Sequence, residues 1–335
     1  MIINPFDTDA FNLVSMVAAV NRLPNLYGRL NQLGLFKDKG VASRTIVVEN
    51  KDGVLNLLQD LPPGSPGQMN TKGTRAARSF VIPHLPLDDL LLPSEYENVR
   101  AFGTENQAET LASIMNDKLQ TMKNKHAITL EYFRMGAVKG LILSADGSTL
   151  YDLYQEFVMP KKSVNFALNS DTTDVRAKCL EVKRHIETYL KGEVMSEVRV
   201  LCDKDFFDAL TNHPKVITAY ERWQNGEALR SDMRAAFPFG GLMFEEYEGT
   251  ATTVGGTARK FITSKYAHAF PMGTMNTFYT YYAPGDFNET ANTIGLPFYA
   301  KQEPVEFNRG IKVHTQSNPL PLCLRPELLV EISTP

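Results

Sequence analysis

The side chains best suited to metal binding or acid–base chemistry are scattered along this 335-residue sequence. Zinc sites built from histidine need short, characteristic spacings such as HExxH, and the six histidines show neither this pattern nor HxH. Cys179 and His185 are six residues apart on an expected helix, a spacing that does not place them on one face. We therefore expect structural roles, and no metal site, for the histidines, which are His84, His126, His185, His213, His268 and His314.

The three cysteines, Cys179, Cys202 and Cys323, are widely spaced and form no CxxC pair. An odd number without a short motif argues against a disulfide framework and against a zinc ribbon. The pattern is typical of a protein made in the cytosol with reduced thiols. We expect three reduced thiols, mostly buried.

Motifs for nucleophilic catalysis and phosphate binding are also missing from the sequence. No GxSxG elbow occurs, and residues 255–260 place glycines near a lysine without the GxxxxGK[ST] spacing of a phosphate-binding loop. The adjacent acids Asp88–Asp89 and Glu245–Glu246 are expected on a solvated face. The aromatic run 278–282 favours a core or a subunit interface over base stacking. No catalytic residue and no cofactor is predicted, although an enzyme without a recognisable motif stays as an alternative.

Composition predicts a soluble globular protein. Hydrophobic residues make up 43% of the chain and charged residues 22%, so a sizeable core of two lobes plus extensions is expected. The net charge of −3 gives no electrostatic drive toward nucleic acid or anionic lipid. Residues 1–7 do not resemble a secretory signal, and no run reaches the roughly 18–20 apolar residues needed to span a bilayer. We expect no membrane partner.

The strongest local signal is a helix over residues 104–139. Thr104 and Gln107 form a capping-box pattern, no proline interrupts the segment, and Gly140 follows it. At about 1.5 Å per residue this helix would be about 50 Å long, which suggests a spine for other elements. Its apolar positions recur with helical periodicity at Leu111, Ile114, Met115, Leu119, Met122, Ile128 or Leu130, Phe133 and Ala137.

Two segments near the N-terminus are predicted to project from the core. Residues 7–20 can form a helix with Phe11, Val14, Val17 and Ala18 on one face. Residues 44–50 read as a strand, and 74–82 are extended again after the proline- and glycine-rich stretch 61–68. Such an arm is marginally stable alone. Segments that cannot fold onto their own core are expected to pack on neighbouring copies.

The remaining pattern mixes helices and strands, so we predict an α+β chain. The Asp146–Gly147 pair predicts a hairpin turn between 141–143 and 150–157. Residues 248–260, rich in glycine and threonine, are expected to be a loop. Helices are predicted at 174–190, ending at Gly192, and at 203–210, and strands at 198–202, 241–247, 276–283 and 328–332.

A colinear set of stretches resembles one known family. They are RTIVVE at 44–49, RAARSFVIPHLP at 75–86, the helix from ETL at 109–111 to LE at 130–131, LILSADG at 141–147 and QSNPLP at 316–321. Their order and spacing run over nearly the whole chain. The sequence resembles the lambda-like major capsid proteins, the E family of tailed-bacteriophage coat proteins.

The resemblance implies the tailed-phage major capsid protein fold, which encapsulins and the floor domain of herpesvirus capsids share. It divides the chain into an N-terminal arm (1–40), an extended β-loop (41–78), a peripheral domain with the long spine helix (79–160 and 301–335) and an axial domain (161–300). Asp52–Gly53 then becomes either a kink in an ascending arm or a hairpin turn, and both readings stay open.

The resemblance also implies a function: a structural subunit that self-assembles as hexamers and pentamers into the icosahedral head of the virion. The implied partners are other copies of itself, a separate scaffolding protein, a portal, a decoration protein and packaged double-stranded DNA bound without sequence specificity. Assembly would take place in the host cytoplasm. An encapsulin-like nanocompartment shell is the alternative within the same fold.

Candidate subunit-interface residues follow from this geometry. Phe6, Phe11 and Val14 are expected to carry the contact of the N-terminal arm. Residues within about 240–260 are expected near a symmetry axis. The extended-loop contact is assigned to Gly64, Pro66, Gln68 and Arg75.

Overall fold

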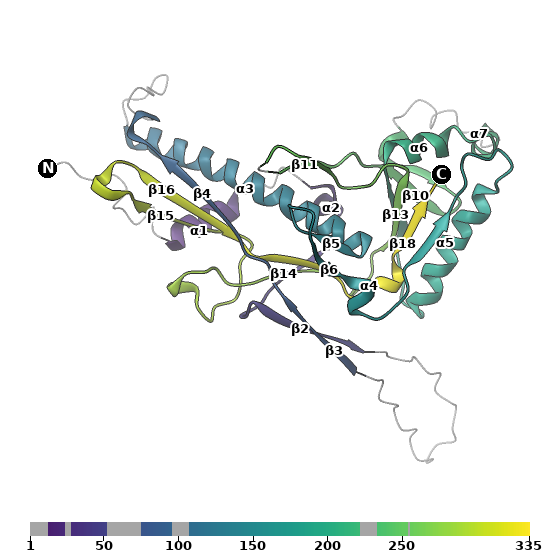
Figure 1. The fold of residues 1–335 in the computed structure, drawn as a ribbon, viewed down its shortest axis with the longest axis horizontal. Coiled ribbons are helices and arrows are strands. Elements are labelled where there is room, and N and C mark those ends of the chain that lie inside the picture. The colour runs from purple at the N-terminus through teal and green to yellow at the C-terminus, as the bar shows by residue number, and fades with distance from the viewer. Residues whose placement is uncertain (1–12, 24–27, 52–74, 96–106, 222–232, 254) are drawn as a thin grey trace, which may run out of the picture.

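The computed structural model describes residues 13–23, 28–51, 75–95, 107–221, 233–253 and 255–335. At residues 49–51, 75–76, 107–112, 221 and 233 it describes the backbone alone. The molecule is an elongated α+β structure (Figure 1). A lobe built on a six-stranded sheet occupies one end, and a thinner body that follows one long helix occupies the rest.

The long helix is α3, Gln107–Lys139, which runs for 33 residues along the body. It ends as predicted, because Gly140 adopts a left-handed backbone with φ +76°. Met115, Leu119, Met122, Phe133 and Ala137 are buried, as their periodicity predicted. Leu130, not Ile128, is the fully buried residue of the alternative pair.

The thin half of the body is a three-stranded antiparallel sheet beside α3. Its order is β15 (Tyr299–Pro304), β16 (Ile311–Ser317) and β4 (Leu85–Leu91). Helix α1, Leu13–Arg22, packs on β15 through Met16, Val17 and Val20. The predicted apolar face of this helix was wrong at two positions, since Val14 is 77% exposed and Ala18 is exposed too, whereas Val17 is buried as predicted.

The middle of the body joins segments that are far apart in the sequence. Strand β14 (Phe278–Tyr282) pairs in parallel with β1 (Lys37–Gly40) and antiparallel with β17 (Pro319–Cys323). The short helix α2, Arg29–Gln32, contacts α3. Residues 13–22 and 28–40 therefore pack on their own chain. The expectation that the N-terminal segment needs a neighbouring copy for cover is wrong for these residues, because β1 finds a backbone partner in β14 and α1 an apolar surface on β15.

Two antiparallel ribbons complete the body. The first is β2 (Thr45–Lys51) with β3 (Arg75–Val81), and the second is β5 (Leu141–Leu143) with β6 (Thr149–Asp152). The turn at Asp146–Gly147 is confirmed, with Gly147 at φ +92°. The predicted strand to residue 157 is wrong after Asp152, whose carboxylate caps the helix α4, Leu153–Glu156, by accepting from the amides of Tyr154 and Gln155.

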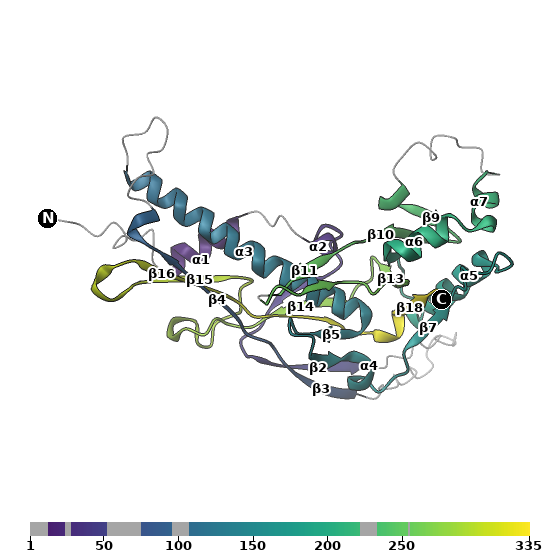
Figure 2. The same ribbon diagram turned by 45° about the horizontal axis from the view of Figure 1, so that its top comes forward.

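The lobe is a six-stranded sheet covered on one side by three helices. Helices α5 (Val175–Leu190), α6 (Lys204–Thr211) and α7 (Pro214–Glu221) belong to this lobe (Figure 2). Asp174 and Asp203 cap α5 and α6, and α5 ends at Lys191 in the left-handed conformation, one residue before the predicted Gly192. The strands, in sheet order, are β7 (Lys162–Asn165), β18 (Val330–Ser333), β13 (Tyr266–Met272), β8 (Glu197–Cys202), β10 (Leu242–Glu246) and β9 (Phe237–Phe239).

Residues of opposite parity on these strands feed two cores. Val200 and Ala269 belong to the core under α5 and α6. Leu201 and Phe270 belong to the core that contains Phe133 of α3. The sheet thus separates the two cores and contributes apolar side chains to each of them.

A hairpin stands where the sequence predicted a loop. Strands β11 (Thr250–Thr252) and β12 (Ala258–Lys260) pair antiparallel, and β11 contacts α3. The glycine- and threonine-rich composition hid these short strands, since threonine alone is a weak strand signal between glycines.

Candidate assembly surfaces

The β2–β3 ribbon leaves the side of the body as an arm with two different faces (Figure 1). Ile46, Val48 and Phe80 are buried against the body, as the alternation of a strand requires. Val47 and Val81, on the other face, are 65% and 59% exposed. A β-branched face of this kind remains available for another surface.

Residues of β6 and α4 hold the base of this arm. In Figure 2 the ribbon runs beneath β5. The ring of Phe80 packs edge-on against Tyr151, with centroids 5.2 Å apart, and lies near Phe157. The Tyr151 hydroxyl accepts from the Val81 amide at 2.7 Å and donates to its carbonyl at 2.9 Å. The arm is therefore rigidly attached where it meets the body.

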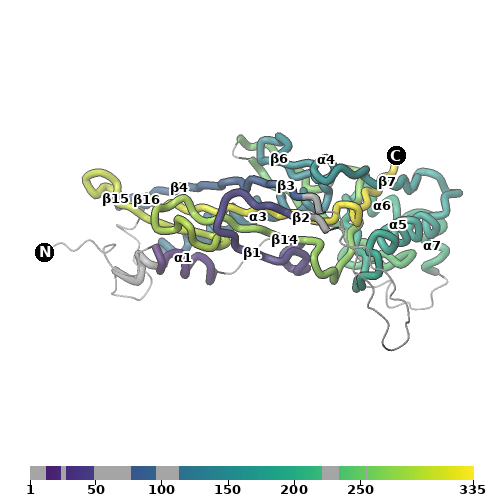
Figure 3. Tube along the Cα trace, turned by 90° about the horizontal axis from the view of Figure 1, so that it is seen from below, coloured from purple at the N-terminus to yellow at the C-terminus, as the bar shows by residue number. Residues whose placement is uncertain are grey.

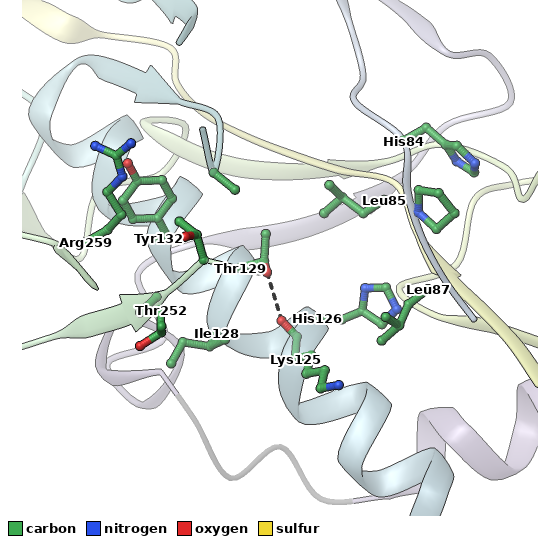
Figure 4. A pocket seen from close by; sticks show the side chains of 14 residues that line it. His84, Leu85, Leu87, Lys125, His126, Ile128, Thr129, Tyr132, Thr252 and Arg259 are labelled. Carbon is green, nitrogen blue, oxygen red and sulfur yellow. Dashed lines mark hydrogen bonds between the residues drawn. The ribbon is translucent and has the colours of Figure 1, made fainter. Parts of the chain in front are cut away.

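A groove of about 530 Å³ lies over α3 (Figure 4). Its floor comes from α3, one wall from the start of β4, and the other from the β11–β12 hairpin and the β5–β6 turn. Arg259 donates to the carbonyl of Asp146 at 2.7 Å, which joins the two parts of the second wall. The lining residues are His84, Leu85, Pro86, Leu87, Lys125, His126, Ile128, Thr129, Tyr132, Ala145, Ala251, Thr252, Thr253 and Arg259.

The chemistry of this groove fits a contact surface better than an active site. Most of the lining is apolar, no lining residue is acidic, and Lys125 and Arg259 form no ion pair with a described carboxylate. Burial, followed by the charge of His314, lowers the pKa of His126 to about 4, so this imidazole is neutral. Within the described lining, the hydroxyls hydrogen-bond to neither histidine; His126 contacts Thr315 and His84 contacts Asn318.

A buried ion cluster joins the N-terminal segment to the lobe. The Glu245 carboxylate accepts from Arg29 at 2.5 Å and from Arg199 at 2.7 Å. The hydrogen bond to Glu245 is the main reason that the pKa of Arg29 is raised. Glu245 is only 5% exposed, so its expected place on a solvated face is wrong. The positive charges of Arg29 and Arg199, which come from distant segments, offset the cost of burying the Glu245 carboxylate.

A second polar cluster fixes the same segment to α3. Arg134 donates to Asn31 and Asp38, both at 2.9 Å, and is nearly buried. Glu131 accepts from the Leu30 amide at 2.8 Å and from the Tyr247 hydroxyl at 3.1 Å. Burial raises the pKa of Glu131. These contacts give Glu131 and Arg134 a structural role.

The structure describes two of the predicted interface residues, which stay predictions. Val14 is exposed on α1, and Arg75 begins β3, with its backbone opposite Lys51 at the outer end of the arm. Neither observation shows what covers them. The other candidates, Phe6, Phe11, Gly64, Pro66 and Gln68, lie outside the described residues.

The structure also shows where the cysteines and the possible metal ligands lie. Cys179, Cys202 and Cys323 are buried and free, as predicted. In the described ranges, histidines, cysteines and acids do not gather in a group of three or more that could hold a metal. Likewise, no helix within those ranges has the length and apolar character to cross a membrane.

Comparison with known proteins assigns the family. Residues 12–334 match the family model of phage major capsid protein E. The major capsid protein of Salmonella phage Felix O1 is 29% identical over 354 residues, and that of Pseudomonas phage KPP10 is 29% identical over 339 residues. Each alignment covers 96% of this chain and 96% of the relative.

Solved structures agree on the fold. A prophage protein of E. coli CFT073 assigned as a capsid protein superposes with a TM-score of 0.62 at 15% identity, covering 97% of this chain and 99% of that one. A phage-related protein from Bordetella bronchiseptica RB50 gives 0.52 at 13% identity, covering 97% and 98%. Family match, curated relatives and fold therefore converge: the chain belongs to the phage major capsid protein E family.

Proposed function

We propose that this protein builds the icosahedral head of a phage as hexamers and pentamers, and that the head encloses double-stranded DNA. The observation that carries the proposal is the match of residues 12–334 to the phage major capsid protein E family. This match favours a phage head over an encapsulin-like compartment. Because the family is structural, we propose that the subunit works by contact and not by catalysis.

We propose the division into domains that the family resemblance implies. Residues 1–40 form the N-terminal arm, 41–78 the extended loop, 79–160 with 301–335 the peripheral domain, and 161–300 the axial domain. Strand β14 lies inside 161–300 and pairs with β1 and β17, which lie outside it. A continuous sheet therefore connects the proposed domains.

We propose that the extended loop of a neighbouring copy covers the groove over α3. Residues 52–61 of the loop carry Asp52, Asp60 and four leucines. This composition complements an apolar groove whose cations, Lys125 and Arg259, have no carboxylate partner among the described residues.

The remaining contacts in the proposal come from the sequence. Val14 of α1 contributes to the arm contact together with Phe6 and Phe11, and Arg75 to the loop contact together with Gly64, Pro66 and Gln68. Residues 240–260 approach the symmetry axis. Assembly takes place in the host cytoplasm with a separate scaffolding protein, a portal and a decoration protein. A net charge of −3 fits DNA held inside without sequence-specific binding.

Deleting residues 61–70 tests this function. We expect the variant to keep the far-ultraviolet circular dichroism and the unfolding midpoint of the wild type, because the described residues form three hydrophobic cores of their own. We also expect it to yield no closed shells in negative-stain micrographs of cells that express it together with the scaffolding protein. Normal particles from the deletion would refute the role of the loop.

A charge change in the groove tests the proposed docking in the same assay. Lys125→Glu places a carboxylate opposite the aspartates of the loop and should reduce the yield of shells. Lys204→Glu, an exposed change of the same charge on the lobe, is the matched control and should leave the yield unchanged. Equal yields from both variants would place the loop elsewhere.

A further inference from the structure

The hairpin that joins β15 to β16 ends in an ordered turn at the end of the molecule opposite the six-stranded lobe (Figures 1 and 3). The Val305 amide donates to the Gly310 carbonyl at 2.9 Å, and the Asn308 amide donates to the Val305 carbonyl at 2.9 Å. These bonds close the turn and fix the direction of its side chains. We call residues 305–310 the β15–β16 tip.

Phe307 is the most exposed large hydrophobic residue that the structure describes, at 86%. Its backbone has φ 62° and ψ 18°, and Asn308 follows with φ 54°. A left-handed backbone is unfavourable for a bulky side chain, and glycine would satisfy it without strain. The aromatic ring therefore helps neither the turn nor the solubility of the monomer. A rigidly presented aromatic is, however, a typical anchor of a protein interface.

The charges around Phe307 are of both signs. Glu306 and Arg309 flank it, both are exposed, and neither forms an ion pair with a described residue. The Arg309 guanidinium lies over the Phe307 ring, 5.4 Å from its centroid. A surface that carries one acid and one base is complementary to itself: about a rotation axis, each base can face the acid of the next copy.

We propose that the β15–β16 tip is a self-association contact, in which Phe307 of one copy packs on the tips of other copies and Arg309 of each pairs with Glu306 of the next. The inference rests on the proposed function, because it names one of the contacts between the subunits of the proposed head. That contact lies at the end of the subunit opposite the lobe. The tip and the lobe lie at opposite ends, so copies that meet through their tips need not touch through their lobes. Tip contacts thus join different capsomers.

Removing the aromatic ring is the first test. Phe307→Gly should fold at least as stably as the wild type, because glycine accepts the backbone of this position. Loss of one buried aromatic per contact should lower the association by about tenfold or more, seen as a matching loss of shells in sedimentation. Asn308→Gly is the control: it also eases the turn but keeps the ring, so it should assemble normally. Wild-type yields from Phe307→Gly would overturn the proposal.

A charge swap distinguishes a self-contact from a contact with another protein. Glu306→Arg and Arg309→Glu should each reduce shell yield, because like charges then meet at the tips. The double variant should recover wild-type yield, since both partners of the contact change together. A double variant as defective as the single ones would show that the tip meets a different surface and would sink the inference.

A thiol introduced at the tip allows the contact to be measured by disulfide cross-linking, without closed shells. The cysteines of this chain are all buried, so Asn308→Cys introduces an exposed thiol at the tip. Oxidation of the concentrated subunit should give more disulfide-linked dimers than Lys204→Cys on the lobe. Equal yields of dimer would reject the tip contact. Tip-linked dimers of Asn308→Cys, together with a wild-type subunit that forms no shell, would instead contradict the proposed function.

Discussion

Individual buried charges fix the N-terminal segment to the lobe, and Glu245 is the best example. Its carboxylate meets Arg29 and Arg199 while only 5% exposed. Loss of both arginines would leave this carboxylate desolvated and unpaired, which typically costs about 3–5 kcal/mol. The sequence could not reveal this, since the two arginines are 216 and 46 residues away. The pair Glu245–Glu246 alone resembles an ordinary surface.

Buried histidines make the subunit sensitive to acid. Burial lowers the pKa of His126 to about 4 and that of His268 to about 3. Their pKa in the unfolded chain is near 6.5, so between these values the unfolded state binds more protons than the folded state. The stabilisation is complete above pH 6.5 and is lost as the pH falls toward 4.

We therefore predict that the free energy of unfolding of the unassembled subunit falls between pH 7 and pH 4.5, and that His126 contributes on the order of 2 kcal/mol of the fall. Urea unfolding at both pH values measures it. His126→Gln, which keeps a polar group beside Thr315 but does not titrate, should show a smaller fall. Equal falls in the variant and the wild type would contradict the assignment.

At the scale of elements, Lys123 of α3 secures helix α1. Its ammonium donates to the carbonyls of Val20 at 2.7 Å and Leu23 at 2.6 Å, and it lies over the ring of Phe298. These carbonyls are the unpaired acceptors that a helix leaves at its C-terminal end. A cation at this end also interacts favourably with the helix dipole. The lysine thus serves as a cap supplied by another element.

We predict that Lys123→Met loosens α1 without unfolding the body. Hydrogen bonds to a charged group contribute about 1.5–3 kcal/mol, so amides of residues 13–22 should exchange with solvent at least tenfold faster in the variant. Hydrogen exchange read by mass spectrometry measures this. Lys125→Met, an exposed change two residues along the same helix, should leave the exchange of α1 unchanged. Unaltered exchange in Lys123→Met would show that apolar contacts alone hold the helix.

Elements with strong local signals could be predicted, and the others could not. Gly140 marks the end of α3, and Asp174 marks the start of α5, because helix ends depend on adjacent residues. The β11–β12 hairpin was missed, since its short strands gain their stability by lying on α3. The exposed side of α1 was also predicted wrongly. Which side of a weakly amphipathic helix is buried depends on the surface that receives it, here β15 with Lys123.

At the scale of the whole molecule, the six-stranded sheet couples two cores. Cys179 and Cys202 lie in the core under α5 and α6, while Cys323 lies in the core beside α3. Burial raises the pKa of all three thiols, that of Cys179 to about 12. Unreactive thiols in both cores make a convenient probe of unfolding.

We predict that the three cysteines become reactive at the same urea concentration, because β8 and β13 contribute side chains to both cores. Pulse alkylation across a urea gradient, read peptide by peptide, measures the midpoint for each cysteine. Labelling of Cys323 at a distinctly lower urea concentration than Cys179 and Cys202 would show that the body unfolds while the lobe remains folded.

The spatial order of the strands is the part that sequence reasoning did not reach. A closing strand near 328–332 was predicted, and β18 stands there. Nothing local to those residues indicates that it lies between β7 and β13, with β7 parallel and β13 antiparallel to it. Long-range pairing depends on which edges remain open once the other strands are placed, so the resemblance to a family provided the architecture where periodicity could not.

The position of β18 has a consequence for the order of events during synthesis. Until the ribosome has made residues 330–333, β7 and β13 have no strand between them, and the core under α5 and α6 lacks Val330 and Ile332. The six-stranded sheet of the lobe therefore cannot be completed until this segment has been made. A polypeptide interrupted before residue 330 should be degraded before it can be incorporated into a growing particle, so the fold itself excludes unfinished copies.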